Sequence, residues 1–88
     1  MSPYSNRINA LTKATALLGF LEAARYLRAA SEMSHPDNVK FYLDGARRLL
    51  DGEIFATHAL AEINDIMREA SFDANRYWLL AGREMVGV

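Results

Sequence analysis

The sequence contains no cysteine and no marked excess of either charge. The absence of cysteine excludes a disulfide scaffold, a Cys-ligated zinc or iron–sulfur site and a thiol nucleophile. Ten basic residues stand against eleven acidic ones, with a formal net charge of −1, and this balance argues against an overall basic nucleic-acid module. The uncharged run from Ala14 to Leu21 is far shorter than the ~20 apolar residues of a membrane-spanning helix. The N-terminus is polar and has no secretion-signal pattern. We therefore expect a cytoplasmic protein without a membrane partner.

Strand-forming patterns are also scarce, because β-branched residues never alternate with polar ones over a strand length. The helix formers Ala, Leu, Arg, Glu and Met dominate instead. The 88 residues, 51% of them hydrophobic, fit a single globular domain spanning 1–88. The apolar spacing predicts an all-α fold, a small bundle of about four helices with a long, largely buried first helix. The predicted bounds are about 5–32, 36–50, 53–70 and 73 onward.

Three breaks separate the predicted helices, at Ser34-His35-Pro36-Asp37, at Asp51-Gly52 and at Ser71-Phe72-Asp73. Ser34 and Asp37 have the spacing of a capping box, so they are expected to start the second helix. Asp73 can cap the fourth. Gly19 lies within the first predicted helix, where it costs ~1 kcal/mol relative to alanine. It indicates a close backbone approach or a kink.

Two stretches carry more large apolar residues than one helix face can hold. Apolar residues between positions 14 and 24 cover most of the circumference of the first helix, and positions 77–80 are four consecutive large apolar residues. A helix that is apolar nearly all round is buried on several sides. We therefore expect a second copy or a larger protein partner to cover this surface; the alternative is that the first helix is the centre of a monomer. The predicted interface residues are Leu17, Leu18, Phe20, Leu21, Tyr77 and Trp78.

A histidine and three carboxylates form a stripe on the third predicted helix, on the side opposite Ile63. Such side chains can bind a divalent metal, but the Glu-x-x-His pairs of di-iron bundles are absent. Because the stripe lies opposite the apolar face, we predict a solvated acidic face. If it is functional, a basic patch on a partner is a better match than a metal ion. The residues are His58, Glu62, Asp65 and Glu69.

The tripeptide His35-Pro36-Asp37 resembles the signature of J-domain co-chaperones, in which it occupies a loop between two antiparallel helices. That resemblance implies binding to a partner chaperone. It covers three residues, and the spacing on both sides departs from the family, since Leu18-Gly19 lies too close to His35 to leave room for the family's preceding loop. Pro36 is also well suited to the first turn of a helix. We interpret the tripeptide as a helix start.

Basic residues are unevenly distributed along the chain. Residues 1–35 hold four basic and two acidic side chains, whereas residues 36–70 hold four basic and seven acidic ones. This asymmetry could favour antiparallel packing or self-association. Arg47 and Arg48 suggest a helix–turn–helix around Asp51-Gly52, but neighbouring acidic residues cancel most of the field that phosphate binding requires.

Nothing in the sequence indicates catalysis. The serines lie at predicted helix ends, where backbone capping explains them, and no phosphate-binding loop or hydrolase motif occurs. We predict no catalytic, cofactor-binding or metal-binding residue. The preferred interpretation is a non-enzymatic interaction module, a regulator, inhibitor or assembly factor that acts as a homodimer or through a larger partner. The alternatives are a nucleic-acid-binding regulator and, less well supported, a carboxylate/His metal-binding bundle.

Overall fold

The chain is an all-α protein, as predicted. A computed structural model describes the backbone of residues 2–86 and the side chains of residues 2–80, and no strand occurs within residues 2–86. The elements are α1 (Ser5–Leu17), α2 (Leu21–Glu32), α3 (Pro36–Leu50), a 3-10 turn η1 (Ile54–Ala56) and α4 (Thr57–Val86). None of the helices within residues 2–86 combines the length and the hydropathy that a membrane-spanning segment needs.

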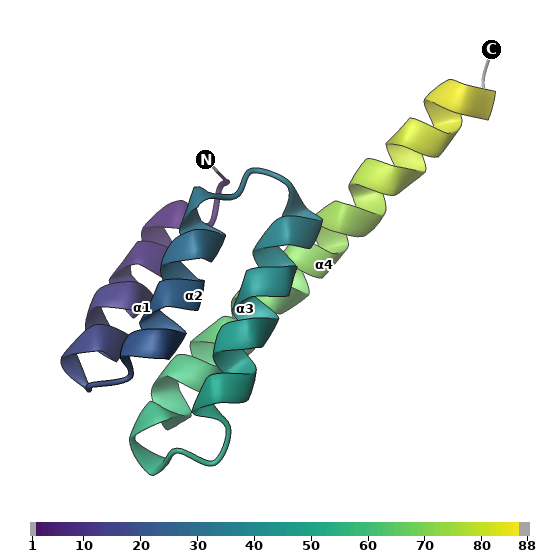
Figure 1. Cartoon of the computed structure of the whole chain (residues 1–88). Helices are drawn as coiled ribbons and strands as arrows, with labels where there is room; N and C mark the ends of the chain where they lie inside the picture. Colours follow the sequence, from purple (N-terminus) through teal and green to yellow (C-terminus); the bar gives the residue numbers. More distant parts are fainter. Residues whose placement is uncertain (1, 87–88) are drawn as a thin grey trace.

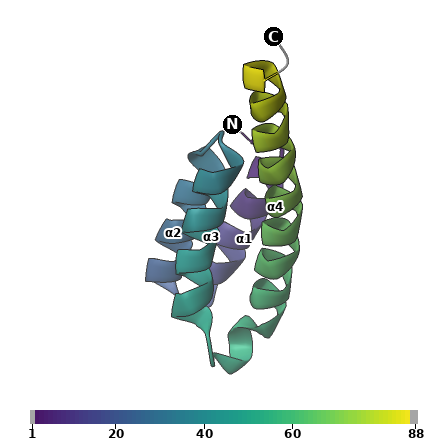
Figure 2. The same ribbon diagram turned by 90° about the vertical axis from the view of Figure 1, so that its right-hand side faces the viewer.

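The helices run alternately up and down, each packing against the next along the chain (Figure 1). Short connections favour this arrangement, because they leave consecutive helices antiparallel neighbours. Helix α4 has 30 residues, at least twice as many as any other helix. Its C-terminal part therefore extends beyond the other three helices, as both views show (Figure 2).

One hydrophobic core joins all four helices. Each helix contributes buried residues at i, i+3 or i+4 spacing, which places them on one face. The core residues include Ile8, Leu11, Leu27, Ala30, Val39, Leu43, Ala46, Leu50, Ile63, Ile66 and Ala70. On α4 the last buried side chain is Ala74 within the part whose side chains are described, so the helix leaves the core there.

The long first helix is wrong, because the chain turns at Gly19. Helix α1 ends at Leu17 and α2 begins at Leu21. Gly19 has φ +91°, a left-handed conformation that costs side-chain-bearing residues ~1–2 kcal/mol. The Phe20 N–H donates to the Thr15 carbonyl oxygen at 3.2 Å and closes the turn. The kink indicated by Gly19 is thus a full reversal of the chain.

The predicted break at Ser71-Phe72-Asp73 is also wrong, since α4 continues through it. Ala70 and Ala74 are both buried and lie four residues apart. The core-facing stripe therefore continues in register across the segment, and helical packing outweighs the capping tendency of Asp73. The sequence predicted one helix before Ser34, where the structure has two, and two helices after Asp51, where the structure has one α-helix. The predicted total of four helices was therefore still correct.

Candidate interaction surfaces

Large apolar side chains are exposed at the end of the bundle formed by the α1–α2 turn and the α3–α4 connection. Leu17 is 89% exposed and Phe55 is 79% exposed. Leu21 and Leu49, from different helices, line the same hollow beside Gly19. Contiguous exposed apolar patches larger than a few hundred Å² mark interaction sites in soluble proteins. We call this surface the apolar end; it consists of Leu17, Leu18, Leu21, Leu49, Ile54 and Phe55.

The predicted interface residues of the first helix belong largely to this surface. Leu17, Leu18 and Leu21 are exposed because they flank the turn at Gly19 instead of lying inside a continuous helix. Phe20 is only partly buried and packs against the core. Ile54 and Phe55 were not among the predicted interface residues, although two adjacent large apolar residues beside the Asp51-Gly52 turn were a usable signal.

Tyr77 and Trp78 lie at the other end of the bundle, so the five predicted interface residues that are exposed belong to two separate surfaces. The Trp78 Nε1–H donates to the Asp37 Oδ2 carboxylate oxygen at 2.9 Å, at the start of α3. The His35 ring lies edge-on to Tyr77, with centroids 4.7 Å apart. Leu49 of the apolar end lies near the opposite end of α3. The fifteen residues of α3 span roughly 22 Å at 1.5 Å per residue.

His35 and Asp37 begin α3, but not by the predicted capping box. The N-cap is His35, whose Nδ1 accepts the Asp37 backbone N–H at 3.1 Å. Pro36 occupies the first helical position, where its missing N–H needs no partner. The side chains of His35 and Asp37 are therefore engaged by the helix start and by Trp78, as the helix-start interpretation requires.

The acidic stripe on α4 faces a cation from its own chain. Arg7 on α1 places Nη2 2.6 Å from Glu62 Oε1 and Nη1 2.8 Å from Glu69 Oε2. The hydrogen bond to Glu62, aided by the charge of Glu69, raises the pKa of Arg7 above its usual value. Arg7 of the basic first third is thus paired with the acidic middle of the sequence within a single chain.

The other members of the stripe are less engaged. Asp65 approaches Arg68 one turn along the same helix at 3.5 Å, and His58 borders a hollow between α1 and α4 that Ala10 and Ala14 also line. Among the residues whose side chains are described, no group of three His, Asp or Glu side chains could hold a metal ion. Two of the four stripe residues, Glu62 and Glu69, therefore serve as the counter-charge of Arg7.

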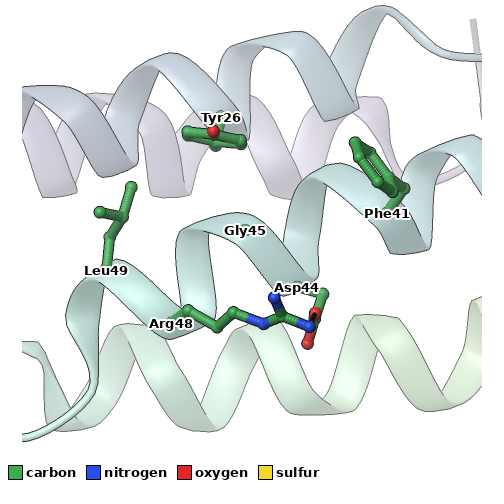
Figure 3. Close-up of a pocket in the computed structure, with 6 residues that line it drawn as sticks. All are labelled: Tyr26, Phe41, Asp44, Gly45, Arg48 and Leu49. Carbon is green, nitrogen blue, oxygen red and sulfur yellow. Dashed lines mark ion pairs between the residues drawn. The ribbon is translucent and has the colours of Figure 1, made fainter.

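A groove between α2 and α3 was not predicted. Tyr26 of α2 lies across Gly45 of α3, while Phe41 and Leu49 lie to either side (Figure 3). A Cβ atom on residue 45 would lie 2.6 Å from the Tyr26 ring, so glycine is required for this close approach. Positions 41, 45 and 49 are four residues apart on α3, beside the core face. This spacing was the sequence signal from which the groove could have been predicted.

The arginines of α3 are compensated locally. Asp44 accepts from Arg47 and contacts Arg48, each pair at 2.8 Å. The hydrogen bond from Arg47, with the charge of Arg48, lowers the pKa of Asp44 below its usual value. One carboxylate therefore neutralises half of the local positive charge, which weakens the case for nucleic-acid binding through this helix.

Comparison with known proteins gives no family assignment. No protein-family model, curated protein or solved structure matches the chain.

Proposed function

We propose that the chain is a small non-enzymatic interaction module that binds a protein partner through the apolar end. The observation that carries this proposal is that six exposed large apolar side chains lie at or beside the two turns at one end of the bundle (Figure 1). Single exposed apolar residues are ordinary on a protein surface, whereas six from two segments at one end of a bundle are not. Burial of this cluster against a partner would provide the driving force for association.

The charges around the apolar end indicate the kind of partner that fits. Glu22, Asp51 and Glu53 are exposed beside or within the two turns. Interfaces commonly surround apolar anchors with a polar rim, and complementary rim charges speed association. The Arg48 side chain, next to Leu49, is 75% exposed as well, so we expect an apolar groove with a rim of mixed charge on the partner.

Site-specific photo-crosslinking in the native cell tests this function. A photoreactive residue at position 17 or 55 is expected to crosslink to one distinct protein, and the same residue at the exposed position of Arg68 is not. Leu17 is 89% exposed, so Leu17→Asp is expected to change the free energy of unfolding by only about 0.5 kcal/mol or less. Combined with the reactive residue at position 55, it should abolish the crosslink. Equal crosslinking from positions 55 and 68 would contradict the proposal.

A further inference from the structure

A small polar and aromatic cluster joins the second half of α4 to the start of α3. Ala74 is the last buried residue of α4 among those whose side chains are described, and the helix then extends past the other three (Figure 1). Beyond Ala74, the Trp78 Nε1–H donates to Asp37 Oδ2 at 2.9 Å. The His35 ring centroid lies 4.7 Å from that of Tyr77 and 5.9 Å from that of Trp78. We call this cluster the latch; it consists of His35, Asp37, Tyr77 and Trp78.

The closed latch requires an unprotonated Nδ1 on His35. This atom accepts the Asp37 backbone N–H at 3.1 Å and so caps α3. An imidazole nitrogen that accepts a hydrogen bond carries no proton, whereas both ring nitrogens of an imidazolium are donors. Protonation at Nδ1 therefore sets two N–H donors against each other, so the cap bond breaks and the ring turns away. Because the ring packs on Tyr77 and Trp78, its movement disturbs both aromatic contacts.

Protonation also brings a competitor for the Asp37 carboxylate. Oδ2, the oxygen that Trp78 binds, lies 3.9 Å from His35 Nδ1. A protonated Nδ1 attracts this oxygen with a full positive charge, whereas the indole N–H is uncharged. The titratable groups placed against His35 are Asp37 on α3 and Tyr77 on α4. Within the described side chains, no ion pair joins His35 to a residue of α1 or α2.

We infer that the latch is a pH-sensitive switch, which holds the second half of α4 against α3 at neutral pH and releases it in mild acid. Histidine is the side chain that ordinarily changes charge between about pH 5 and 8. Release frees Tyr77 and Trp78, which are 48% and 57% exposed while the latch is closed. The core stays intact, because none of the four latch residues belongs to it.

The switch goes beyond the proposed function and does not depend on it. The latch lies at the start of α3, whereas Leu49 of the apolar end lies near the opposite end of that helix. Release in acid adds a second, conditional binding surface, since half-exposed aromatic side chains become fully accessible to a partner. The pH then decides whether that surface is available.

Solvent protection of the Trp78 indole N–H tests the switch, because Trp78 is the one tryptophan of the chain. NMR gives its exchange rate at about pH 7.5 and about pH 5, on either side of the histidine range. Each rate is divided by that of free tryptophan at the same pH, which removes the intrinsic pH dependence of exchange. We expect protection to fall at least about fivefold in acid, the effect of losing a typical N-cap bond.

Substitutions at His35 hold the latch in one state or the other. The side-chain oxygen of His35→Asn caps a helix and does not titrate, so protection should be high and equal at both pH values. His35→Ala removes the cap acceptor and the ring, and it should show the low protection of the acid state already at neutral pH. Circular dichroism checks that both variants remain helical.

The second histidine provides the matched control. His58 is exposed near the start of α4, far along the helix from Trp78, so His58→Asn should keep the wild-type response to pH. Equal indole protection at the two pH values in the wild-type chain overturns the inference. A response that persists in His35→Asn, or one that is lost in His58→Asn, overturns it as well.

Discussion

At the scale of single residues, Gly45 shows how a missing side chain brings two helices together. The Tyr26 ring occupies the space that a Cβ atom on residue 45 would fill. Tyr26 and Tyr42 then lie with ring centroids 6.3 Å apart on the same face. A glycine in the middle of a helix reduces helix stability by about 1 kcal/mol, so packing against the tyrosine ring outweighs helical propensity here.

We predict that Gly45→Ala lowers the free energy of unfolding by about 1–2 kcal/mol, because the added methyl group displaces the Tyr26 ring. Urea denaturation followed by circular dichroism measures the change. In a Tyr26→Ala background the same substitution should instead stabilise the chain by up to about 1 kcal/mol through helix propensity. A stabilising effect in the wild-type background would show that the ring moves aside freely.

At the scale of elements, local signals determined some helix boundaries and packing determined others. Helix α3 spans Pro36–Leu50, as its proline start and regular apolar spacing predicted. The split between α1 and α2 was missed because both sides of Gly19 are apolar, and apolar periodicity does not report a reversal of direction. The continuity of α4 was missed for the opposite reason, since a plausible cap at Asp73 needs a break that the buried stripe through Ala74 does not allow.

The turn at Gly19 yields a prediction about backbone handedness. Gly19→Ala should lower the free energy of unfolding by about 1–2 kcal/mol, because an L-residue is strained at positive φ. A Cβ at this position meets no atom within 4 Å, so the effect is one of conformation and not of collision. A D-alanine introduced at position 19 by chemical ligation should keep or raise the stability. Equal losses for the L and D residues in thermal unfolding would refute this explanation.

At the scale of the whole molecule, Arg7 links the first helix to the last. Its guanidinium pairs with two carboxylates of α4, and all three side chains are at least one-third exposed. Such pairs are weakened by solvent, so their contribution is modest. The link still aligns α1 with the acidic stripe and leaves that stripe only partly available to an outside partner.

We predict that Arg7→Ala lowers the free energy of unfolding by about 1 kcal/mol at low salt, because it removes both pairs and leaves the carboxylates to repel one another. The loss should shrink in 1 M sodium chloride as screening increases. Arg68→Ala, which removes only the longer contact to Asp65, is the matched control and should change stability by less than about 0.5 kcal/mol. Equal, salt-independent losses for the two variants would argue against the electrostatic link.

The sequence by itself determined the all-α class, the start and end of α3 and the excess of apolar residues around Leu17 and Trp78. These features depend on propensity, capping and periodicity, which act over a few neighbouring residues. Tertiary structure decided which surfaces that excess forms. Trp78 binds Asp37 at one end of α3, and Leu21 and Leu49 line one hollow near the other. The members of each pair lie 28 to 41 positions apart in the chain, and only the packing of the helices brings them to the same place.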